Sequence, residues 1–515
     1  MIGSKMSKSH KYLLVATISM WGLLPPAGQA MTLGDVVAYA YETNPGLQAQ
    51  RAEVRATDET YVQARAGYGL TVSLAAGATA YNIERNHSKA DADTNNNSIS
   101  IVQPLYTGGR VRARVSEAEA QVLSSREQLR RVEMDLLQRV VAAYLAVRRD
   151  EQLLKIAQDT VEVLNRGLSD TKAKYDVHAV TITDLAQSRA RLSQAKTQLF
   201  GTQEQLADSR AQFFAVVGQN PLDLQPPPVL EALPANVEQA FDAAEANNPQ
   251  ILSAQYVEKG SRARVARAKA GLAPTINARL EFQHAPYLPY QHRSYDNTRV
   301  ASVVVNQPLF AAGQIQSAIR QSIEENNRDR LTVDDTRLQV IQNVSFSWER
   351  LVSLRQQLIT LQEEMKADEL AFLGVRAEER FALRSNIEIL NAAAELNAAQ
   401  QNYTRAAAAE YVARVQLLAQ IGMLAPGLLS KGGSSYDPAE NFRKVKNIGI
   451  TPLEIPVRLL DAMGSQPIAR PRPASLAESQ PIGSAPQPTP TAPKAATSVL
   501  EIIKLDPKAT TLPSS

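Results

Sequence analysis

The fold is decided by the stretch Gln103-Pro104-Leu105-Tyr106-Thr107-Gly108-Gly109, because the chain contains it twice. The second copy is Gln307-Pro308-Leu309-Phe310-Ala311-Ala312-Gly313, and the offset between the copies is about 204 residues. Each copy follows a short run of alternating apolar residues and precedes a long helical pattern. Proline ends a strand because it cannot keep donating to the ladder, and glycine lets the backbone turn sharply. Both copies predict a strand-to-helix switch, carried by Pro104, Gly108 and Gly109 and by Pro308 and Gly313.

The same offset relates residues far outside this motif. Matching pairs are Asn44-Pro45 with Asn248-Pro249, Ala64-Arg65-Ala66-Gly67 with Ala268-Lys269-Ala270-Gly271, Asp184 with Glu388, Leu192 with Leu396 and Gly218 with Gly422. Chance explains one such match, but not a constant register over roughly 175 residues. The sequence therefore contains an internal tandem duplication.

Composition favours long packed helices. The chain has 515 residues, of which 44% are hydrophobic and only 5% are aromatic. This mixture suits helices that pack side by side better than the core of a sheet-rich enzyme. Cysteine is absent, which excludes disulfides, zinc–thiolate sites, cysteine nucleophiles and a lipid-modified N-terminal cysteine.

The N-terminal segment 1–30 has the pattern of a secretory signal peptide. Lys5, Lys8 and Lys11 form a basic start, an apolar run covers 12–24, and Gly28-Gln29-Ala30 supplies small residues before a cleavage site. A membrane anchor would need roughly 20 apolar residues, more than this run contains. Without the three lysines the 55 basic residues become 52, equal to the 52 acidic residues. The mature chain therefore lacks the basic surface expected of a nucleic-acid-binding protein.

Alternating apolar residues predict four strands. In the first copy the alternation covers 70–80, a polar stretch covers 86–97, and an extended pattern resumes at 98–102. In the second copy strands at 275–283 and 300–306 flank a loop. A period of two indicates strands with one apolar and one polar face.

Apolar residues three or four positions apart predict the helices. Residues 32–66 form a helix with Thr32 as N-cap and an interruption at Asn44-Pro45. A helix of roughly 60 residues, about 90 Å long, follows each switch; its charged opposite face indicates lateral packing in water rather than a membrane span. Turn regions at 169–180 and 373–384 lead into returning helices at 181–217 and 385–421.

These patterns divide the chain into five segments. They are a signal peptide (1–30), a first repeat (31–220), a proline-rich linker (221–240), a second repeat (241–424) and a largely disordered C-terminal tail (425–515). The prediction for the tail depends on its high content of proline, alanine, serine and threonine after about residue 465.

The number of strands predicts an oligomer. Single-chain membrane barrels begin at about eight strands, so four strands cannot close one. Open sheet edges cannot face lipid, because each unpaired backbone group there costs several kcal/mol. Three chains would supply twelve strands and a water-filled lumen. The predicted fold class is therefore mainly α with a small β part, in which a short trimeric barrel continues into a long α-helical barrel.

These features together resemble the TolC-type family of outer-membrane efflux proteins. The resemblance rests on the signal peptide, the duplication, the paired Gln-Pro-Leu-aromatic motifs and the long helices, and it covers Met31 to Leu424. It implies a homotrimer in the outer membrane of a Gram-negative bacterium, with a large periplasmic part that includes the C-terminal tail. Members serve as exit ducts for type I protein secretion or drug efflux. Partners implied are outer-membrane lipid, a periplasmic adaptor (membrane fusion) protein and an inner-membrane pump of the ABC or RND type.

The resemblance also implies a closed periplasmic entrance at the two helical turns. It assigns this role to Asp184 in the first repeat and to Arg384, Glu388 and Asn391 in the second. Asn391 stands where the family usually has a second acidic residue, so a neutral amide would weaken a ring that binds cations. Threefold symmetry would repeat each of these residues around the entrance.

The residues themselves offer a local alternative. Thr181 and Ser385 each precede an acidic residue by three positions, which is the spacing of a capping box. An acid in the first turn also suits the helix dipole. Capping is the favoured role for Asp184, whereas the entrance is favoured for Glu388, and the two roles can coexist.

Nothing in the sequence predicts an enzyme, a metal site or a cofactor. It has no P-loop, no Ser-His-Asp arrangement and no paired carboxylates in a pocket pattern. His87, His178, His284 and His292 are scattered near turns and loops, where solvated histidines are common. The alternative function is a periplasmic coiled-coil structural or adaptor protein, although the all-β domain and inner-membrane anchor of an adaptor are missing from the pattern. Through the resemblance, the missing lipidation cysteine favours protein secretion over small-molecule efflux.

Overall fold

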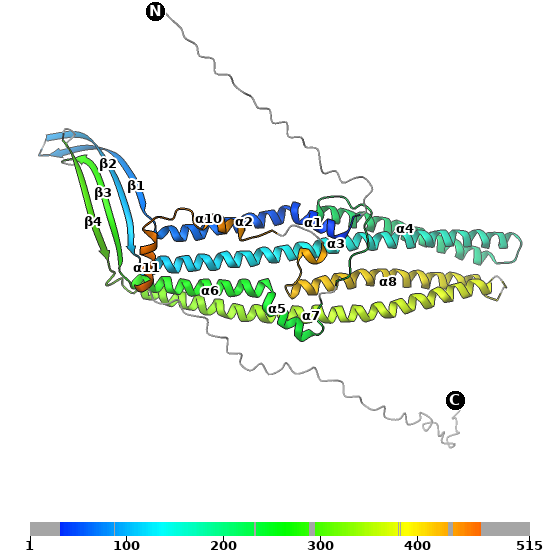
Figure 1. The fold of residues 1–515 in the computed structure, drawn as a ribbon. Coiled ribbons are helices and arrows are strands. Elements are labelled where there is room, and N and C mark those ends of the chain that lie inside the picture. The colour runs from blue at the N-terminus through cyan, green and yellow to red at the C-terminus, as the bar shows by residue number, and fades with distance from the viewer. Residues whose placement is uncertain are drawn as a thin grey trace, which may run out of the picture. The chain divides into compact units, whose positions relative to one another are not determined.

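The computed structural model describes residues 31–86, 88–230, 233–287, 294–379, 381, 383–430 and 436–464. The predicted signal peptide, His87, His292 and the chain after residue 464 lie outside the described residues. The described residues belong to the first of two structural units, which covers 1–468. In this unit the strands lie at one end of a set of long helices, and two helical hairpins end at the other (Figure 1).

Four antiparallel strands form one sheet in the order β1-β2-β3-β4. They are β1 (Thr71–Arg85), β2 (Ser88–Tyr106), β3 (Thr275–Pro286) and β4 (Tyr295–Asn306). Since β1 and β2 come from the first repeat and β3 and β4 from the second, the β2–β3 pair joins the repeats. The prediction of a mainly helical chain with four strands is confirmed.

The register aligns similar side chains in rows across the sheet. Two apolar rows are Val72–Ile101–Leu280 and Leu74–Ile99–Phe282. The row between them is Ser73–Ser100–Glu281. Directly opposed residues of antiparallel strands point to the same face. The sheet therefore has an apolar face and a polar face in this region.

All four strands extend beyond their predicted bounds, and β2 does so at both ends. The polar stretch 86–97, expected to separate two strands, belongs largely to β2, which pairs with β1 from Arg85 and Ser88 onward. Backbone groups make this pairing, so polar side chains do not end the strand. In addition, β2 continues past Pro104 to Tyr106, with an irregular register to β3 between these residues. Such irregularities are positions at which a sheet tolerates proline.

Two long helices lead away from the sheet. They are α3 (Arg110–Asp176) and α7 (Gln314–Glu379), of 67 and 66 residues. Each folds back into a hairpin with α4 (Ile182–Val217) or α8 (Asn386–Gln420). Both long helices enter the predicted turn regions, because lysine, alanine and glutamate in those regions favour helix. In the part of the chain that the structure describes, no helix is both long and apolar enough to cross a membrane.

Shorter helices precede the strands of each repeat. The first repeat has α1 (Leu33–Thr43), α2 (Pro45–Arg65) and the 3₁₀ helix η1 (Ala66–Tyr68); the second has α5 (Val237–Asn247), α6 (Pro249–Lys269) and η2 (Ala270–Leu272). Thr32 caps α1, as predicted, and forms a capping box with Asp35. The predicted interruption at Asn44-Pro45 is also present, and Asn44 caps α2 there. Proline at the first helical position suits the break, because its missing N–H needs no partner there.

A buried hydrophobic cluster is formed mainly by residues of α1, α3, α4, α7 and α8. Tyr144 of α3 is fully buried, and its hydroxyl donates to the carbonyls of Gln225 (2.6 Å) and Met31 (3.1 Å). Burial raises the pKa of Tyr144 to about 12. Both the chain before α1 and the linker between the repeats are thereby fastened to α3.

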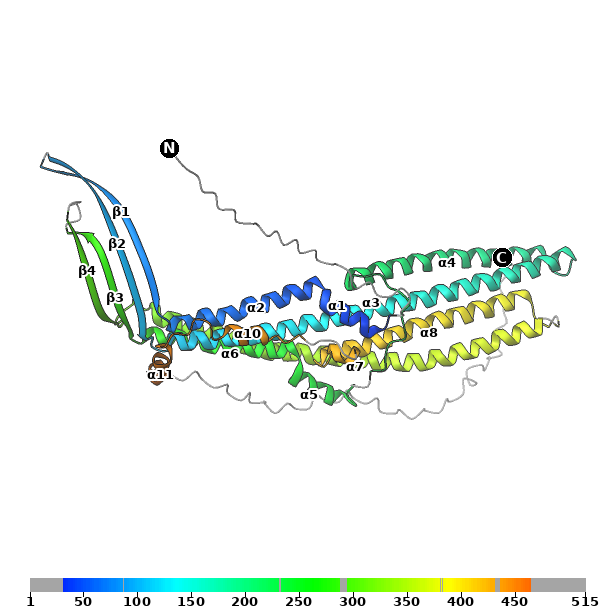
Figure 2. The same cartoon turned by 45° about the horizontal axis from the view of Figure 1, so that its top comes forward.

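A C-terminal segment that sequence patterns did not predict follows the second repeat. After the short α9 (Pro426–Leu429), residues 436–464 form the C-terminal strap, which contains α10 (Glu440–Val445) and α11 (Glu454–Gly464). Asn441 donates to Asp58 of α2 (2.9 Å), and Phe442 packs edge-on against Tyr61. The strap follows α2 and brings α11 to the base of the strands (Figures 1 and 2).

Candidate functional site

The tip of the first hairpin, between α3 and α4, is closed by a capping box. Asp184 Oδ2 accepts hydrogen bonds from the backbone N (2.9 Å) and Oγ1 (2.7 Å) of Thr181, and Asp184 N donates to Thr181 Oγ1 (3.2 Å). The hydrogen bonds from the Thr181 hydroxyl and backbone lower the pKa of Asp184. The capping role expected of Asp184 is thus present in its geometry.

The tip of the second hairpin, between α7 and α8, carries a charged cluster around Arg384. Its guanidinium donates to Glu378 (2.7 Å) and Glu388 (3.0 Å), while the Ser385 hydroxyl donates to Glu388 (2.8 Å). The hydrogen bonds from Ser385 and then Arg384 lower the pKa of Glu388, and those to Glu378 and Glu388 raise the pKa of Arg384. The three charged side chains are about half exposed, so solvent screens each pair.

The two repeats differ in how they begin the returning helix. Thr181 forms a reciprocal capping box, but Ser385, predicted to do the same, makes no side-chain hydrogen bond of this kind to the helix backbone. Each hydroxyl donates to the acidic residue three positions later, but Glu388 also accepts a hydrogen bond from Arg384. The capping box predicted at Ser385 is therefore incomplete, because its hydroxyl accepts no hydrogen bond from the backbone of α8.

Polar links join the two hairpins near their tips. Lys174 of α3 forms an ion pair with Glu379 of α7. Arg191 of α4 donates to the Asn391 side-chain oxygen of α8 (3.3 Å). Asn391, which the sequence singled out for its missing charge, thus accepts a hydrogen bond from the other repeat. Of the predicted entrance residues, the structure brings Arg384 and Glu388 together and leaves Asp184 with its own capping threonine.

Sequence reasoning missed Lys174, Glu378, Glu379 and Arg191. The duplication gave a partial signal, because Lys174 and Glu378 occupy equivalent places in the repeats and carry opposite charges, although Lys174 pairs with the next residue, Glu379. Opposite charges at equivalent positions of adjacent hairpins favour an ion pair between them. No comparable sequence signal indicates the contact between Arg191 and Asn391.

At the other end of the helices, each switch turns the chain through residues with positive φ. Gly108 and Gly109 have φ of 65° and 82°, and Ala312 and Gly313 have φ of 46° and 81°. A Cβ on Gly108 would lie 2.6 Å from the Cβ of Ala273. Gly108 therefore permits both the turn and the close approach of the second repeat.

The glutamine of each motif ties the end of a strand to the short helix that precedes the sheet. Gln103 Nε2 donates to the Tyr68 carbonyl (3.0 Å), and Gln307 Nε2 donates to the Leu272 carbonyl (2.8 Å). Tyr68 ends η1 and Leu272 ends η2, so the duplication preserves this bond. The prolines Pro104 and Pro308 follow these glutamines at the margins of β2 and β4.

The first switch contacts the C-terminal strap. Asp461 of α11 is fully buried. Its Oδ1 accepts hydrogen bonds from Thr107 N (2.9 Å), Thr107 Oγ1 (2.9 Å) and Gly109 N (3.0 Å), and the Tyr68 hydroxyl donates to Oδ2 (3.3 Å). A single carboxylate therefore holds the joint between strand and helix.

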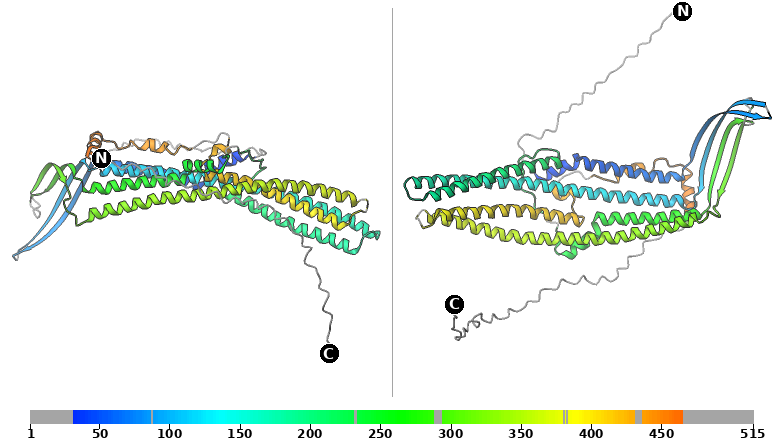
Figure 3. Two further views of the ribbon diagram at one scale, coloured as in Figure 1. Left: turned by 90° about the horizontal axis from the view of Figure 1, so that it is seen from below. Right: turned by 180° about the vertical axis from the view of Figure 1, so that it is seen from behind.

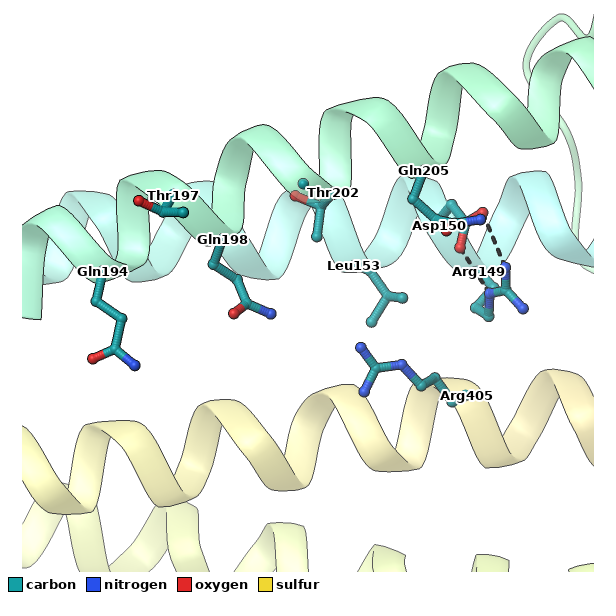
Figure 4. A pocket seen from close by; sticks show the side chains of 10 residues that line it. Arg149, Asp150, Leu153, Gln194, Thr197, Gln198, Thr202, Gln205 and Arg405 are labelled. Carbon is teal, nitrogen blue, oxygen red and sulfur yellow. Dashed lines mark hydrogen bonds and ion pairs between the residues drawn. The ribbon is translucent and has the colours of Figure 1, made fainter.

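A polar groove of about 870 Å³ lies between the first hairpin and α8. Gln194, Gln198 and Gln205 of α4 line it, Arg149 pairs with Asp150 on α3 (2.7 Å), and Arg405 reaches across from α8 (Figure 4). Glutamine amides and a paired arginine can bind polar solutes through hydrogen bonds. They provide neither a nucleophile nor a general base for catalysis.

The described residues contain no group of three or more His, Asp or Glu side chains able to hold a metal ion. His284 contacts Asn297 (2.9 Å) and stacks on Tyr295 across β3 and β4. His178 occupies a left-handed position (φ 59°) at the tip of the first hairpin. These two histidines are therefore placed far apart, at opposite ends of the helices.

Comparison with known proteins places both repeats in one family model. The model described as outer membrane efflux protein matches residues 36–219 and 240–423. The outer membrane efflux protein BepC of Brucella suis biovar 1 is 29% identical over 444 residues, which cover 85% of this chain and 96% of BepC. The outer membrane protein TolC of Vibrio cholerae is 23% identical over 429 residues, covering 78% of this chain and 93% of that protein.

Solved structures show the same fold. The open state of the MtrE outer membrane channel of Neisseria gonorrhoeae matches with a TM-score of 0.65 and 16% identity, covering 78% of this chain and 91% of MtrE. A crystal structure of CusC matches with a TM-score of 0.67 and 17% identity, covering 76% of this chain and 92% of CusC.

Proposed function

The chain belongs to the outer membrane efflux protein family, and we propose that three copies of it form an exit channel with a closed periplasmic entrance. Family membership makes the chain an outer-membrane efflux channel of a tripartite export system, with helices that extend into the periplasm, rather than an enzyme. The periplasmic adaptor considered as the alternative finds no support, because the family model covers both repeats. The proposal concerns the closure of the barrel, the entrance and the partners.

The proposal of a trimer rests on the open edges of the four-stranded sheet. In the described part of the chain, β1 and β4 each pair on one side only. Such edges are not tolerated in lipid, where each unpaired backbone group costs several kcal/mol. Three sheets of four strands would join β1 of one copy to β4 of the next and close a barrel wide enough for a lumen. The apolar rows would face lipid, and the rows with Ser73 and Glu281 would face the lumen.

The entrance of the channel lies, in this proposal, at the tips of the two hairpins. Lys174–Glu379 and Arg191–Asn391 join the hairpins of one chain. These links support a resting state in which the hairpins move together. Arg384 with Glu378 and Glu388 supports the turn between α7 and α8. Opening would require the links between hairpins to break.

Planar-bilayer conductance of the purified full-length protein tests the entrance. We expect Lys174→Glu to increase single-channel conductance, because the ion pair becomes a repulsion, and the double change Lys174→Glu with Glu379→Lys to restore the wild-type value. Arg384→Ala with Glu388→Ala is expected to increase conductance as well. Glu440→Ala, which removes an exposed pair on the C-terminal strap, is the control. Unchanged conductance in both Lys174→Glu and the Arg384/Glu388 variant would reject the entrance.

Exposed apolar residues at the hairpin tips support a partner at that end. They are Val177 and Ile182 in the first hairpin and Phe381 and Leu383 in the second. Apolar side chains gathered on a surface mark interaction sites. We propose that a periplasmic adaptor protein docks here and connects the channel to an inner-membrane ABC or RND pump, which delivers protein substrates or small molecules. Loss of adaptor co-purification in Val177→Asp, with Val229→Asp as an exposed control, tests this contact.

The proposed division of the chain into two repeats and a linker is supported by the two matches to the family model. The two family matches, 36–219 and 240–423, support repeats at 31–220 and 241–424 around a linker at 221–240. We propose that residues 1–30 are removed on export. Mass spectrometry of the protein from outer membranes tests this, because an intact N-terminus would exclude cleavage.

A further inference from the structure

Helix α11 of the C-terminal strap has its polarity reversed relative to a helix packed on a protein in water. The residues that face the protein include two carboxylates, since Glu454 and Asp461 are buried. The residues that face away are apolar: Ile455, Leu459, Leu460 and Met463 are 65%, 63%, 54% and 85% exposed. A surface helix in water normally buries its apolar stripe and exposes its charges.

Specific bonds hold this orientation. Asp461 accepts hydrogen bonds from the Thr107 and Gly109 amides and from two hydroxyls. Glu454 lies 3.6 Å from the buried guanidinium of Arg65, whose other nitrogens donate to carbonyls of the strap. Rotating α11 to bury its leucines would break these bonds and leave charges unpaired, so the outward apolar stripe is a fixed property of the fold.

The position of α11 shows what this stripe faces. The helix packs on η1, β2 and α3, at the base of the sheet, and runs crosswise to the long helices in views from two sides (Figures 1 and 3). Tyr68, which bonds Asp461, is two residues before Leu70, and the apolar rows of the sheet begin at Val72. The stripe therefore lies beside the end of the sheet at which these apolar rows begin.

We propose that α11 is an interfacial helix whose stripe of Ile455, Leu459, Leu460 and Met463 inserts into the periplasmic leaflet of the outer membrane. Interfacial helices lie in the membrane plane with apolar side chains among the acyl chains and basic side chains near the phosphates. If the long helices extend away from the membrane into the periplasm, α11, which runs crosswise to them, lies in the membrane plane and meets the first condition. Arg458, half exposed on α11 and 3.9 Å from Glu454, provides a basic side chain for the second.

This inference rests on the outer-membrane location and adds a second attachment to the barrel. The chain has no cysteine and so no lipidated cysteine to anchor it. A stripe at the barrel base would fix the depth of the channel in the bilayer. A neighbouring copy of the chain is the competing occupant, and the experiment below separates the two.

The absence of cysteine makes site-directed spin labelling direct. Single-cysteine variants Leu459→Cys and Met463→Cys of the full-length protein are labelled and reconstituted in vesicles of phosphatidylethanolamine and phosphatidylglycerol. Power saturation then compares collisions with oxygen, which concentrates in lipid, and with a water-soluble nickel complex. Leu74→Cys on the apolar face of β1 is the lipid reference, and Val177→Cys at the hairpin tip is the water reference.

We expect both α11 labels to show an oxygen-to-nickel ratio several-fold above that of Val177→Cys and close to that of Leu74→Cys. A nickel-accessible label at 459 and 463 would show that the stripe faces water and would overturn the inference. Labels shielded from both reagents would place a protein surface there, such as a second copy, and would equally overturn it. The Leu74 label reports on the barrel independently, so failure of the barrel proposal is distinguishable from failure at α11.

Discussion

Replacing Asp461 by alanine tests whether one carboxylate holds the joint between strand and helix. The change removes the acceptor for the amides of Thr107 and Gly109 and for the hydroxyls of Thr107 and Tyr68. A hydrogen bond to a charged group contributes about 1.5–3 kcal/mol, and a buried donor left unsatisfied costs about 1–3 kcal/mol. Two orphaned amides at a fully buried site therefore predict a loss of about 3 kcal/mol in the local free energy of opening.

Amide hydrogen exchange measures this quantity at the site itself. Local opening governs the exchange of protected amides. A loss of about 3 kcal/mol corresponds to exchange roughly 100-fold faster in peptides that contain residues 107–109. Asp461→Asn keeps one oxygen acceptor but loses the charge, so it is expected to give a smaller acceleration, of roughly tenfold.

The control is Asp437→Ala, which lies in the same strap but faces solvent and pairs with Arg443. It is expected to leave exchange at 107–109 unchanged. Exchange within twofold of wild type in Asp461→Ala would refute the argument, because it would mean that the amides find other partners or that α11 does not rest on the switch. Faster exchange along the whole of α3 would instead indicate global destabilisation.

Three further predictions follow from individual contacts. Gly422→Ala is expected to lower thermal stability at least twice as much as Gly218→Ala. Both positions have positive φ, which costs about 1–2 kcal/mol for alanine, but only at 422 would the new Cβ lie 2.3 Å from a backbone oxygen, that of Asn247. Equal losses in circular-dichroism melts would contradict this. Tyr144→Phe is expected to cost about 1–2 kcal/mol in denaturant unfolding, whereas Tyr175→Phe at the exposed hairpin should cost nothing; a neutral Tyr144→Phe would mean that other groups serve the two carbonyls. Because the pKa of Glu388 is lowered in the folded protein, its hydrogen bonds with Ser385 and Arg384 stay intact above pH 4.5, the ordinary pKa of glutamate, and are lost as the pH falls through the lower folded pKa. Conductance should therefore be constant from pH 7 to 5 and rise only below pH 4.5. Glu388→Gln should remove that rise.

The sequence predicted those parts of the fold that repeat or that follow a simple period. The constant offset between Gln103 and Gln307 placed both switches, and the structure preserves even the bond that each glutamine makes to a preceding short helix. Period two found the apolar rows of the sheet. It could not find the outer half of β2, because paired strands beyond the apolar rows are held by backbone bonds and allow polar side chains.

The site was only partly visible in the sequence, for a physical reason. A capping box is a local pattern, and Thr181 with Asp184 could be predicted from spacing alone. The links Lys174–Glu379 and Arg191–Asn391 join residues about 200 positions apart, so they depend on how two hairpins pack rather than on any local pattern. The C-terminal strap lies outside the duplication, and its helices are too short for periodicity to indicate them.

The two switches of one chain are not equivalent, because Asp461 of the C-terminal strap binds the first of them. At this switch Thr107 provides both an amide and a hydroxyl to Asp461. In the second copy the equivalent residue is Ala311, which has no hydroxyl. The two preceding apolar residues, Leu309 and Phe310, are exposed. The motif therefore diverges at the position where the strap binds and is preserved at the glutamine that both repeats use. In a barrel of three chains, the first switch of each chain, bound by Asp461, would alternate around the ring with the second switch, in which Ala311 replaces Thr107.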